Sequence, residues 1–219
     1  MKFNARTIQI LRNFSTINES LIFKPGNQLK TISQTKTIMA RANIDQAIDS
    51  TFAIFDLPQF MSAVSMFEDP ELTPNGSVLT ISRGTEKLNY TLSEPSLILS
   101  PPEKELVLEE PEVEFELKNE VLTRTLKALG IIGAPEFAIT GDGSKVYVEA
   151  INTKNSSGSN YRVEVGETTK QFRFIFVAEN MKLLPGDYHV SIAAKGLSHF
   201  KSDDVEYWIA LEAHSTYQG

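Results

Sequence analysis

The amino-acid sequence predicts an α+β fold in which two similar domains follow each other along the chain. A strand-to-helix passage at residues 52–61, FAIFDLPQFM, recurs 120 positions later as FRFIFVAENM at residues 172–181. Each copy is preceded by a short amphipathic helix and followed by two alternating strands. The 219 residues suffice for two domains of about 110 residues each. Such a tandem repeat builds a surface or a ring, and neither requires a catalytic centre.

The first half contains two predicted helices with apolar faces. One runs from Asn4, a suitable N-cap residue, to about Asn18, and the other begins near Pro58, which suits a first helical turn. Alternating apolar residues and intervening turn residues predict strands at 29–33, 37–44, 51–55, 78–82 and 88–92, with a turn at 74–76.

The second half repeats this order. A helix is expected at 118–129, ended by Gly130 and Gly133, and a shorter one at 178–184. Strands are expected at 112–117, 136–140, 145–150, 161–165, 171–176, 188–194 and 206–213, with a flexible loop at 155–160. Each half therefore reads as two helices on one face of mostly antiparallel sheets.

Residues 93–111 are predicted to connect the two domains. Four prolines interleave with glutamates there, which favours an extended backbone over a helix. We place the first domain at 1–110, connector included, and the second at 111–219. Two apolar patches, 97–99 and 106–108, indicate that the connector packs on a domain, because a free linker would not need them.

Composition narrows the class of protein. Cysteine is absent, which excludes disulfides, thiolate nucleophiles and cysteine metal sites. The chain has neither a run of about 18 apolar residues nor a secretory signal, so a soluble, unsecreted protein is expected. The net charge of −7 argues against a polyanionic partner, but seven glutamates lie between residues 103 and 116. The remainder is close to balanced and can carry local basic faces.

No constellation of catalytic or metal-binding residues emerges. The three histidines, His189, His199 and His214, lack the close spacing of metal ligands. The segment GDGSK at 141–145 lacks the phosphate-loop pattern and is expected to be a hairpin turn. Acidic clusters at 68–71 and 203–204 are the remaining candidates for acid–base work, and nothing else converges on them. We expect no enzyme, no cofactor and no metal.

Basic helix faces are the remaining functional signal. The first helix of each half places cations with few acids on its open side, and Lys182 on the last predicted helix adds another. Taken alone, these residues could be ordinary exposed helix positions. Because both halves share the arrangement, we predict sequence-independent contacts with phosphates. The candidates are Lys2, Arg6, Arg12, Arg124, Lys127 and Lys182.

Several segments resemble the sliding clamps of T4-type bacteriophages over nearly the whole chain. They are LRNFSTIN at 11–18, ANI at 42–44, AID at 47–49, FAIFDL at 52–57, NMK at 180–182, PGDY at 185–188 and YWIALEAHST at 207–216. Agreement is poor between residues 61 and 113 and in the 155–160 loop. The resemblance implies two processivity-fold domains per subunit and a homotrimeric ring, with helices lining the hole.

The same resemblance implies the function. Members of this family encircle double-stranded DNA, are loaded by an ATP-driven clamp loader, tether the phage DNA polymerase and support late transcription, without enzymatic activity. The location would be the cytoplasm of the infected host. Clamp partners insert a short apolar peptide beside the connector, for which Leu97, Leu99, Leu106 and Leu108 are candidates. These leucines could instead simply pin the connector. Strands near 88–92 and 161–165 are candidates for the joint between subunits.

Two alternatives come from other classes. A virion or assembly protein with two α+β modules would need neither the acid-poor helix faces nor loading onto DNA. A carboxylate-based hydrolase would need Glu71, Asp203 and Asp204 to meet in one deep pocket.

Overall fold

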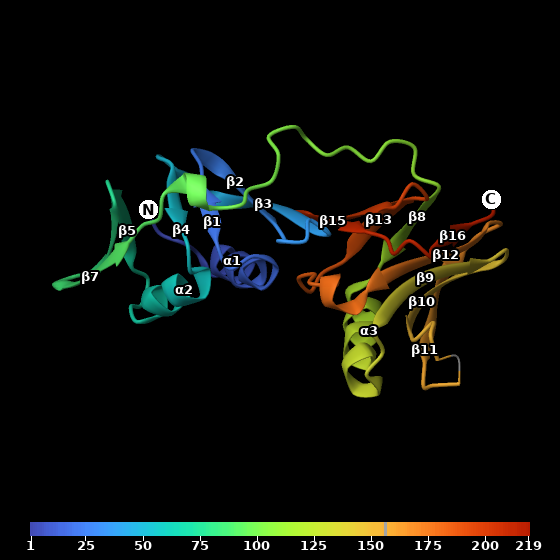
Figure 1. The fold of residues 1–219 in the computed structure, drawn as a ribbon. Helices are drawn as coiled ribbons and strands as arrows, with labels where there is room; N and C mark the ends of the chain where they lie inside the picture. Colours follow the sequence, from blue (N-terminus) through green and yellow to red (C-terminus); the bar gives the residue numbers. More distant parts are fainter. Residues whose placement is uncertain (156) are drawn as a thin grey trace. The chain divides into compact units, whose positions relative to one another are not determined.

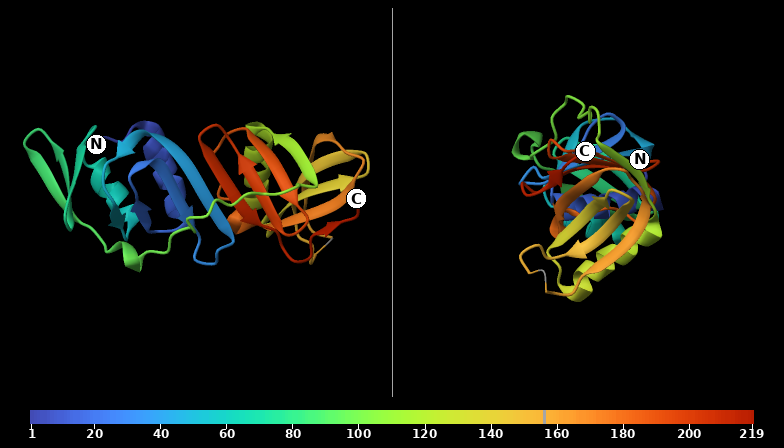
Figure 2. Two further views of the ribbon diagram at one scale, coloured as in Figure 1. Left: turned by 90° about the horizontal axis from the view of Figure 1, so that it is seen from above. Right: turned by 90° about the vertical axis from the view of Figure 1, so that its right-hand side faces the viewer.

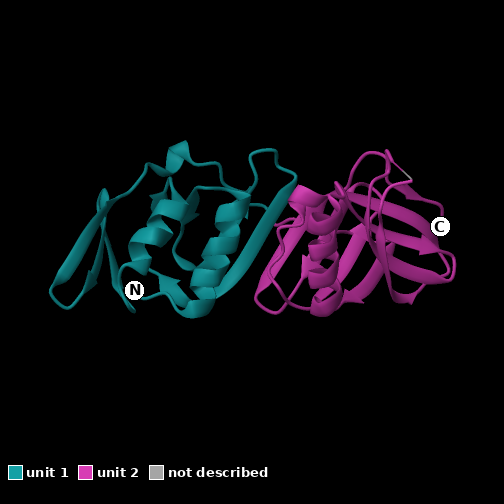
Figure 3. Ribbon diagram, turned by 90° about the horizontal axis from the view of Figure 1, so that it is seen from below, with its two compact units in different colours: residues 1–104 teal, residues 105–219 magenta. Residues whose placement is uncertain are grey.

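A computed structural model describes residues 1–155 and 157–219. Ser156, in the middle of the predicted 155–160 loop, lies outside the described residues. The chain divides into two compact units, residues 1–104 and 105–219 (Figure 3). The division falls within the segment 93–111, and each unit combines helix with antiparallel sheet (Figure 1). The predicted α+β class is confirmed.

The first unit contains two helices and four antiparallel strand pairs. Its elements are α1 (Ala5–Ile17), β1 (Leu21–Phe23), β2 (Gly26–Ile32), β3 (Ile38–Ile48), β4 (Phe52–Ile54), α2 (Leu57–Ser65), β5 (Glu71–Asn75), β6 (Val78–Arg83), β7 (Glu86–Thr91) and the 3-10 turn η1 (Pro95–Leu97). β1 pairs with β4, β2 with β3, and β6 lies between β5 and β7. Helix α1 packs against α2, β2 and β3.

Local signals account for most of this unit. The Asn4 side chain accepts a hydrogen bond from the backbone N–H of Thr7 at 2.8 Å and begins α1, and Asp56 caps α2 in the same way. Apolar side chains of α1 at helical spacing, Ile10, Leu11 and Phe14, are fully buried against the strands.

Two strands of the first unit, β1 and β5, were not predicted from the sequence. Pro74 lies within β5 and not in a turn, while the turn is formed by Gly76 and Ser77. Proline is tolerated there because β5 is an edge strand of its sheet, where a missing N–H costs no ladder bond. The connector is also not extended throughout, because η1 forms one 3-10 turn directly after Glu94.

The second unit contains one α-helix and two sheets. Its elements are β8 (Val113–Leu117), α3 (Asn119–Ile132), β9 (Glu136–Asp142), β10 (Lys145–Ile151), β11 (Tyr161–Glu167), β12 (Gln171–Val177), the 3-10 turn η2 (Ala178–Asn180), β13 (Tyr188–Ala193), β14 (Leu197–Lys201), β15 (Val205–Ala210) and β16 (Thr216–Tyr217). One sheet has the order β11-β10-β9-β12-β16, and β8, β13, β14 and β15 form antiparallel neighbours in the other (Figure 2). Helix α3 packs on β9, β10 and β11 and ends at Gly133, which adopts the left-handed conformation expected of it.

The helix predicted at 178–184 is wrong. Only the 3-10 turn η2 forms, so the second copy of the repeat keeps its strand, β12, but loses its helix. Pro185 disfavours helical geometry at Leu184. The Leu184 backbone is held instead by two tyrosines: its N–H donates to Tyr207 Oη at 3.2 Å, and its carbonyl accepts from Tyr188 Oη at 2.6 Å. The first repeat is followed by three strands and the second by four, where two were predicted for each, because β5, β14 and the short β16 were missed.

Candidate nucleic-acid interface

The open side of α1 centres on Arg12. Because the buried residues Ile10, Leu11 and Phe14 fix the inner side, the helical period of 3.6 residues places Gln9, Arg12 and Thr16 on the outer side. Arg12 is exposed and, among the described residues, has no ion pair or side-chain hydrogen bond. The helix contains no acidic residue, so this guanidinium is available to a phosphate.

The other two candidate cations of the first unit are placed differently. Arg6 is half-buried on the flank of α1, and its guanidinium donates to Gln9 Oε1 at 2.8 Å. Lys2 precedes the helix and forms an ion pair with Asp69 at 2.7 Å. The structure therefore brings Arg12 to the centre of the open face and leaves Lys2 and Arg6 nearer its margins.

Helix α2 adds a neutral wall beside Arg12. A hollow between the two helices is lined by Arg12, Ser15, Pro58, Met61, Ser62 and Ser65, and Figure 3 shows the helices next to each other. The serine hydroxyls donate inward to helix carbonyls, from Ser15 to Arg12 O at 2.8 Å and from Ser62 to Pro58 O at 2.9 Å. Ser65 does the same to Ser62 O at 2.7 Å. Their protons are engaged, so the wall offers few fixed donors to a ligand.

Helix α3 presents both charge signs on its open side. Leu122, Thr125 and Leu129 are buried, which turns Lys127 and Arg124 outward together with Glu120. Arg124 pairs with Glu120 at 2.6 Å, one helical turn away, and both side chains are largely exposed. Lys127 has no ion pair among the described residues. The net positive charge of this face therefore rests on Lys127.

Lys182 does not lie on a helix. It follows η2 in a segment without regular structure and is half-buried. The prediction that Lys182 lies on a helix was therefore wrong, although the residue still contributes a positive charge to the second unit.

The connector leucines separate into two groups. Leu97 and Leu99 line a hollow of the first unit together with Phe55, Gln34 and the end of α1 at Asn18, Glu19 and Ser20. Leu97 and Phe55 are 70% and 67% exposed, which is high for large apolar side chains. Leu106 and Leu108 belong to the second unit, where Leu106 is exposed and Leu108 half-buried.

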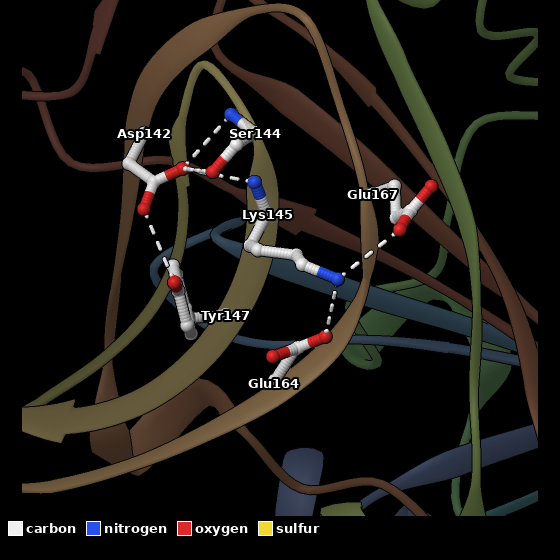
Figure 4. A network of polar contacts seen from close by, with 6 residues as sticks. All are labelled: Asp142, Ser144, Lys145, Tyr147, Glu164 and Glu167. Carbon is white, nitrogen blue, oxygen red and sulfur yellow. Dashed lines mark hydrogen bonds and ion pairs between the residues drawn. The ribbon is translucent and has the colours of Figure 1, made fainter.

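The glycine-rich segment at 141–145 is a hairpin turn organised by Asp142 (Figure 4). Asp142 Oδ1 accepts from the backbone N–H groups of Ser144 at 2.9 Å and Lys145 at 2.8 Å. These hydrogen bonds, the one from Lys145 first, hold the pKa of Asp142 well below its usual range. Lys145 Nζ in turn contacts Glu164 at 2.9 Å and Glu167 at 3.1 Å. The N–H groups that would bind a phosphate are thus occupied by the protein's own carboxylate.

The three histidines, and Glu68 and Asp69 of the first acidic cluster, are engaged in pairs. His199 Nε2 lies 2.9 Å from Glu206 and its ring stacks on Trp208 with centroids 4.6 Å apart. Glu68 pairs with Arg83 at 2.7 Å, as Asp69 does with Lys2. Within residues 1–155 and 157–219, no group of three or more histidines and carboxylates is arranged to hold a metal ion. No helix of this described part is long and apolar enough to cross a membrane.

Two α+β units with helices packed on antiparallel sheets define the clamp fold of DNA polymerase processivity factors. The proliferating cell nuclear antigen of A. fulgidus, solved with the C-terminal region of FEN-1 bound, superposes with a TM-score of 0.70 at 15% identity, covering 95% of this chain and 96% of that one. The family model described as DNA polymerase processivity factor matches residues 3–99. The model described as gp45 sliding clamp, C terminal, matches residues 114–213.

The chain belongs to the sliding clamp family of T4-type bacteriophages. It is 31% identical to the sliding clamp of Vibrio phage KVP40, covering 97% of this chain and 100% of the relative. It is 29% identical to the sliding clamp of Enterobacteria phage T4, covering 99% of both chains. The predicted resemblance and the predicted function, a processivity clamp in phage DNA replication, are confirmed.

Proposed function

We propose that three copies of this chain form a ring around duplex DNA, with the open faces of α1, α2 and α3 toward the DNA. The observation that carries this proposal is the placement of Arg12. It stands on an acid-free helix beside serines whose hydroxyl protons are turned inward. Such a surface attracts phosphates without offering a fixed set of donors, which suits movement along DNA.

Two exposed strand edges suit the joint between subunits. β7 is one edge of its three-stranded sheet, and β11 is one edge of its five-stranded sheet. Unpaired edges are templates for pairing with another chain, and one edge from each unit would allow a head-to-tail ring. We therefore keep residues 88–92 and 161–165 as the proposed joint.

The hollow at Phe55, Leu97 and Leu99 is the proposed seat for partner peptides. The A. fulgidus relative of the fold carries a segment of FEN-1. By analogy, an apolar peptide of the phage DNA polymerase would occupy this hollow, and the ring would tether the polymerase. A clamp loader would place the ring on DNA, and late transcription factors would use the same seat. The clamp itself would have no enzymatic activity and would act in the host cytoplasm.

Retention on circular DNA tests the ring. The clamp, loaded onto a nicked circular duplex by its phage's loader and ATP, is expected to remain on the DNA during gel filtration. Cutting the circle with a restriction enzyme should release it, because a ring slides off a free end. The Leu97→Ser variant serves as control, since it should be retained equally but should support less processive synthesis. Retention that survives cutting would indicate direct binding and contradict the ring.

A further inference from the structure

A second, basic hollow of the first unit lies along the same stretch of connector as the apolar hollow at Leu97. Residues two positions apart in a strand share a face, so Gln28 and Lys30 lie on one face of β2. Ser20 precedes β1 and lines the apolar hollow, while Lys24 follows β1 and lines the basic one. The second hollow, of about 190 Å³, is lined by Ile22, Lys24, Pro25, Gln28, Lys30, Ser100, Pro101 and Glu103. Connector residues 97–103 thus contribute side chains to both hollows.

The connector's own carboxylate occupies the basic hollow. Glu103 forms an ion pair with Lys24, and the charge of Lys30 acts on it as well. The hydrogen bond from Lys24 is the main cause of the lowered pKa of Glu103. Both side chains of the pair are exposed to solvent, at 82% for Glu103 and 47% for Lys24, so the contact contributes little net stability.

The stretch of connector around Glu103 is held by side chains. Within the described part of the chain, residues 99–104 make no backbone–backbone hydrogen bonds. The attachment of this stretch therefore depends on side chains: Leu99 and Pro101 against the strands, and Glu103 on Lys24. A ligand with a carboxylate can replace Glu103 without breaking any ladder.

We propose that Glu103 competes with a partner protein for the basic hollow at Lys24 and Lys30. The occupant that displaces it is an extended segment of a partner protein, with apolar side chains for the Phe55 and Leu97 end and a carboxylate for Lys24 and Lys30. The charges select this occupant, because two lysines and one replaceable glutamate leave a carboxylate as the complementary group. This inference rests on the proposed peptide seat and adds the chemistry of its partner and a regulatory contact.

The test uses the full-length clamp and two synthetic peptides in a calorimetric titration at low salt. Both contain a Leu-Phe anchor, and one carries two aspartates after it where the other carries two asparagines. Wild type should bind the aspartate peptide more tightly. Glu103→Gln should increase the affinity for the aspartate peptide by about twofold to fivefold, the range for an exposed ion pair. It should leave the affinity for the asparagine peptide unchanged. The double variant Lys24→Gln/Lys30→Gln should abolish the preference.

Glu109→Gln is the matched control, since Glu109 is an exposed connector glutamate outside both hollows. It should behave as wild type. If Glu103→Gln increased the affinity for both peptides equally, the proposed competition between charges would be overturned. The same would follow if the wild type bound both peptides with equal affinity. If neither peptide binds although the clamp is retained on circular DNA, this inference is overturned and the ring is left intact.

Discussion

Nδ1 of His189 on β13 lies 2.8 Å from Oε1 of Glu116, the residue opposite it on β8. The other ring nitrogen, Nε2, lies 3.3 Å from Glu114, which also accepts from Ser191 Oγ at 2.9 Å. The hydrogen bond to Glu116 is the main reason that the pKa of His189 is raised above 6.5. On the other neighbouring strand, β14, the opposite residue is Lys201.

This arrangement predicts a pH dependence of stability. A raised pKa in the folded state means that the protonated histidine stabilises the fold below about pH 6.5, and that this stabilisation is lost as pH rises through the folded pKa. His189→Gln should therefore lower the melting temperature more at about pH 6 than at about pH 8.5. The effect will be small, about a few tenths of a kcal/mol, because the group is largely exposed.

The partner variant Glu116→Gln provides the control for the histidine. In that background, replacing His189 should have a weaker pH-dependent effect, because the main hydrogen-bond partner is gone. An equal loss of melting temperature at both pH values would show that the imidazole acts through packing and not through charge.

A second prediction concerns the start of α1. Asn4 caps the helix through Thr7 and also donates to Asp45 Oδ2 at 2.6 Å, which ties the helix to β3. Asn4→Ala should lower the free energy of unfolding by about 1 kcal/mol, the usual value of a cap. Asn4→Ser keeps the capping oxygen and should cost less. Denaturant unfolding at one protomer concentration measures both, and equal losses would mean that the cap does not stabilise α1.

The parts of the fold that the sequence predicts are those decided by neighbouring residues. Asn4 before an apolar stripe, Gly133 after one, and GDGS between two alternating runs each carry their signal within a few positions. The outward direction of Arg12 follows in the same way from the helical period, once the buried stripe of α1 is identified.

The parts that it does not predict depend on contacts between distant residues. Leu184 is kept out of a helix by the hydroxyl of Tyr207, 23 positions away, as well as by Pro185. Lys2 meets Asp69 across 67 positions, and Glu103 meets Lys24 across 79. No local pattern identifies such partners. The candidate cations could thus be identified from the sequence, but the sequence did not show which of them form ion pairs within the protein.

A third prediction tests the β7 edge. The Leu92 N–H donates to Ser77 O, and alternation along the antiparallel ladder makes Leu79–Tyr90 a hydrogen-bonded pair as well. The N–H of Asn89 therefore points away from β6. Asn89→Pro removes this outward donor and the exposed side-chain hydrogen bond from Thr80 Oγ1 at 3.1 Å, but no backbone bond of the β6–β7 ladder. It should therefore weaken the proposed trimer with little effect on the subunit fold.

Light scattering over a range of micromolar concentrations measures this effect. Asn89→Ala, which loses the same side chain and its hydrogen bond from Thr80 but keeps the backbone N–H, is the matched control and should leave the mass unchanged. A trimeric mass for Asn89→Pro equal to that of wild type would remove β7 from the joint.

The last prediction concerns the open helix faces. Arg12→Glu and Lys127→Glu should each reduce clamp-dependent processive synthesis, and more strongly as salt falls. The reason is that repulsion between a carboxylate and phosphates is screened over about 10 Å at 0.1 M salt and over longer distances below it. Arg12→Gln should have a smaller effect, because it removes an attraction without adding repulsion. It should lower the salt slope of DNA association by about 0.9 for each phosphate that the protein no longer neutralises.

Lys195→Glu, in the exposed turn between β13 and β14, is the matched control for charge reversal. If Lys195→Glu impairs synthesis as much as Arg12→Glu at low salt, net charge and not the face of α1 governs the interaction with DNA.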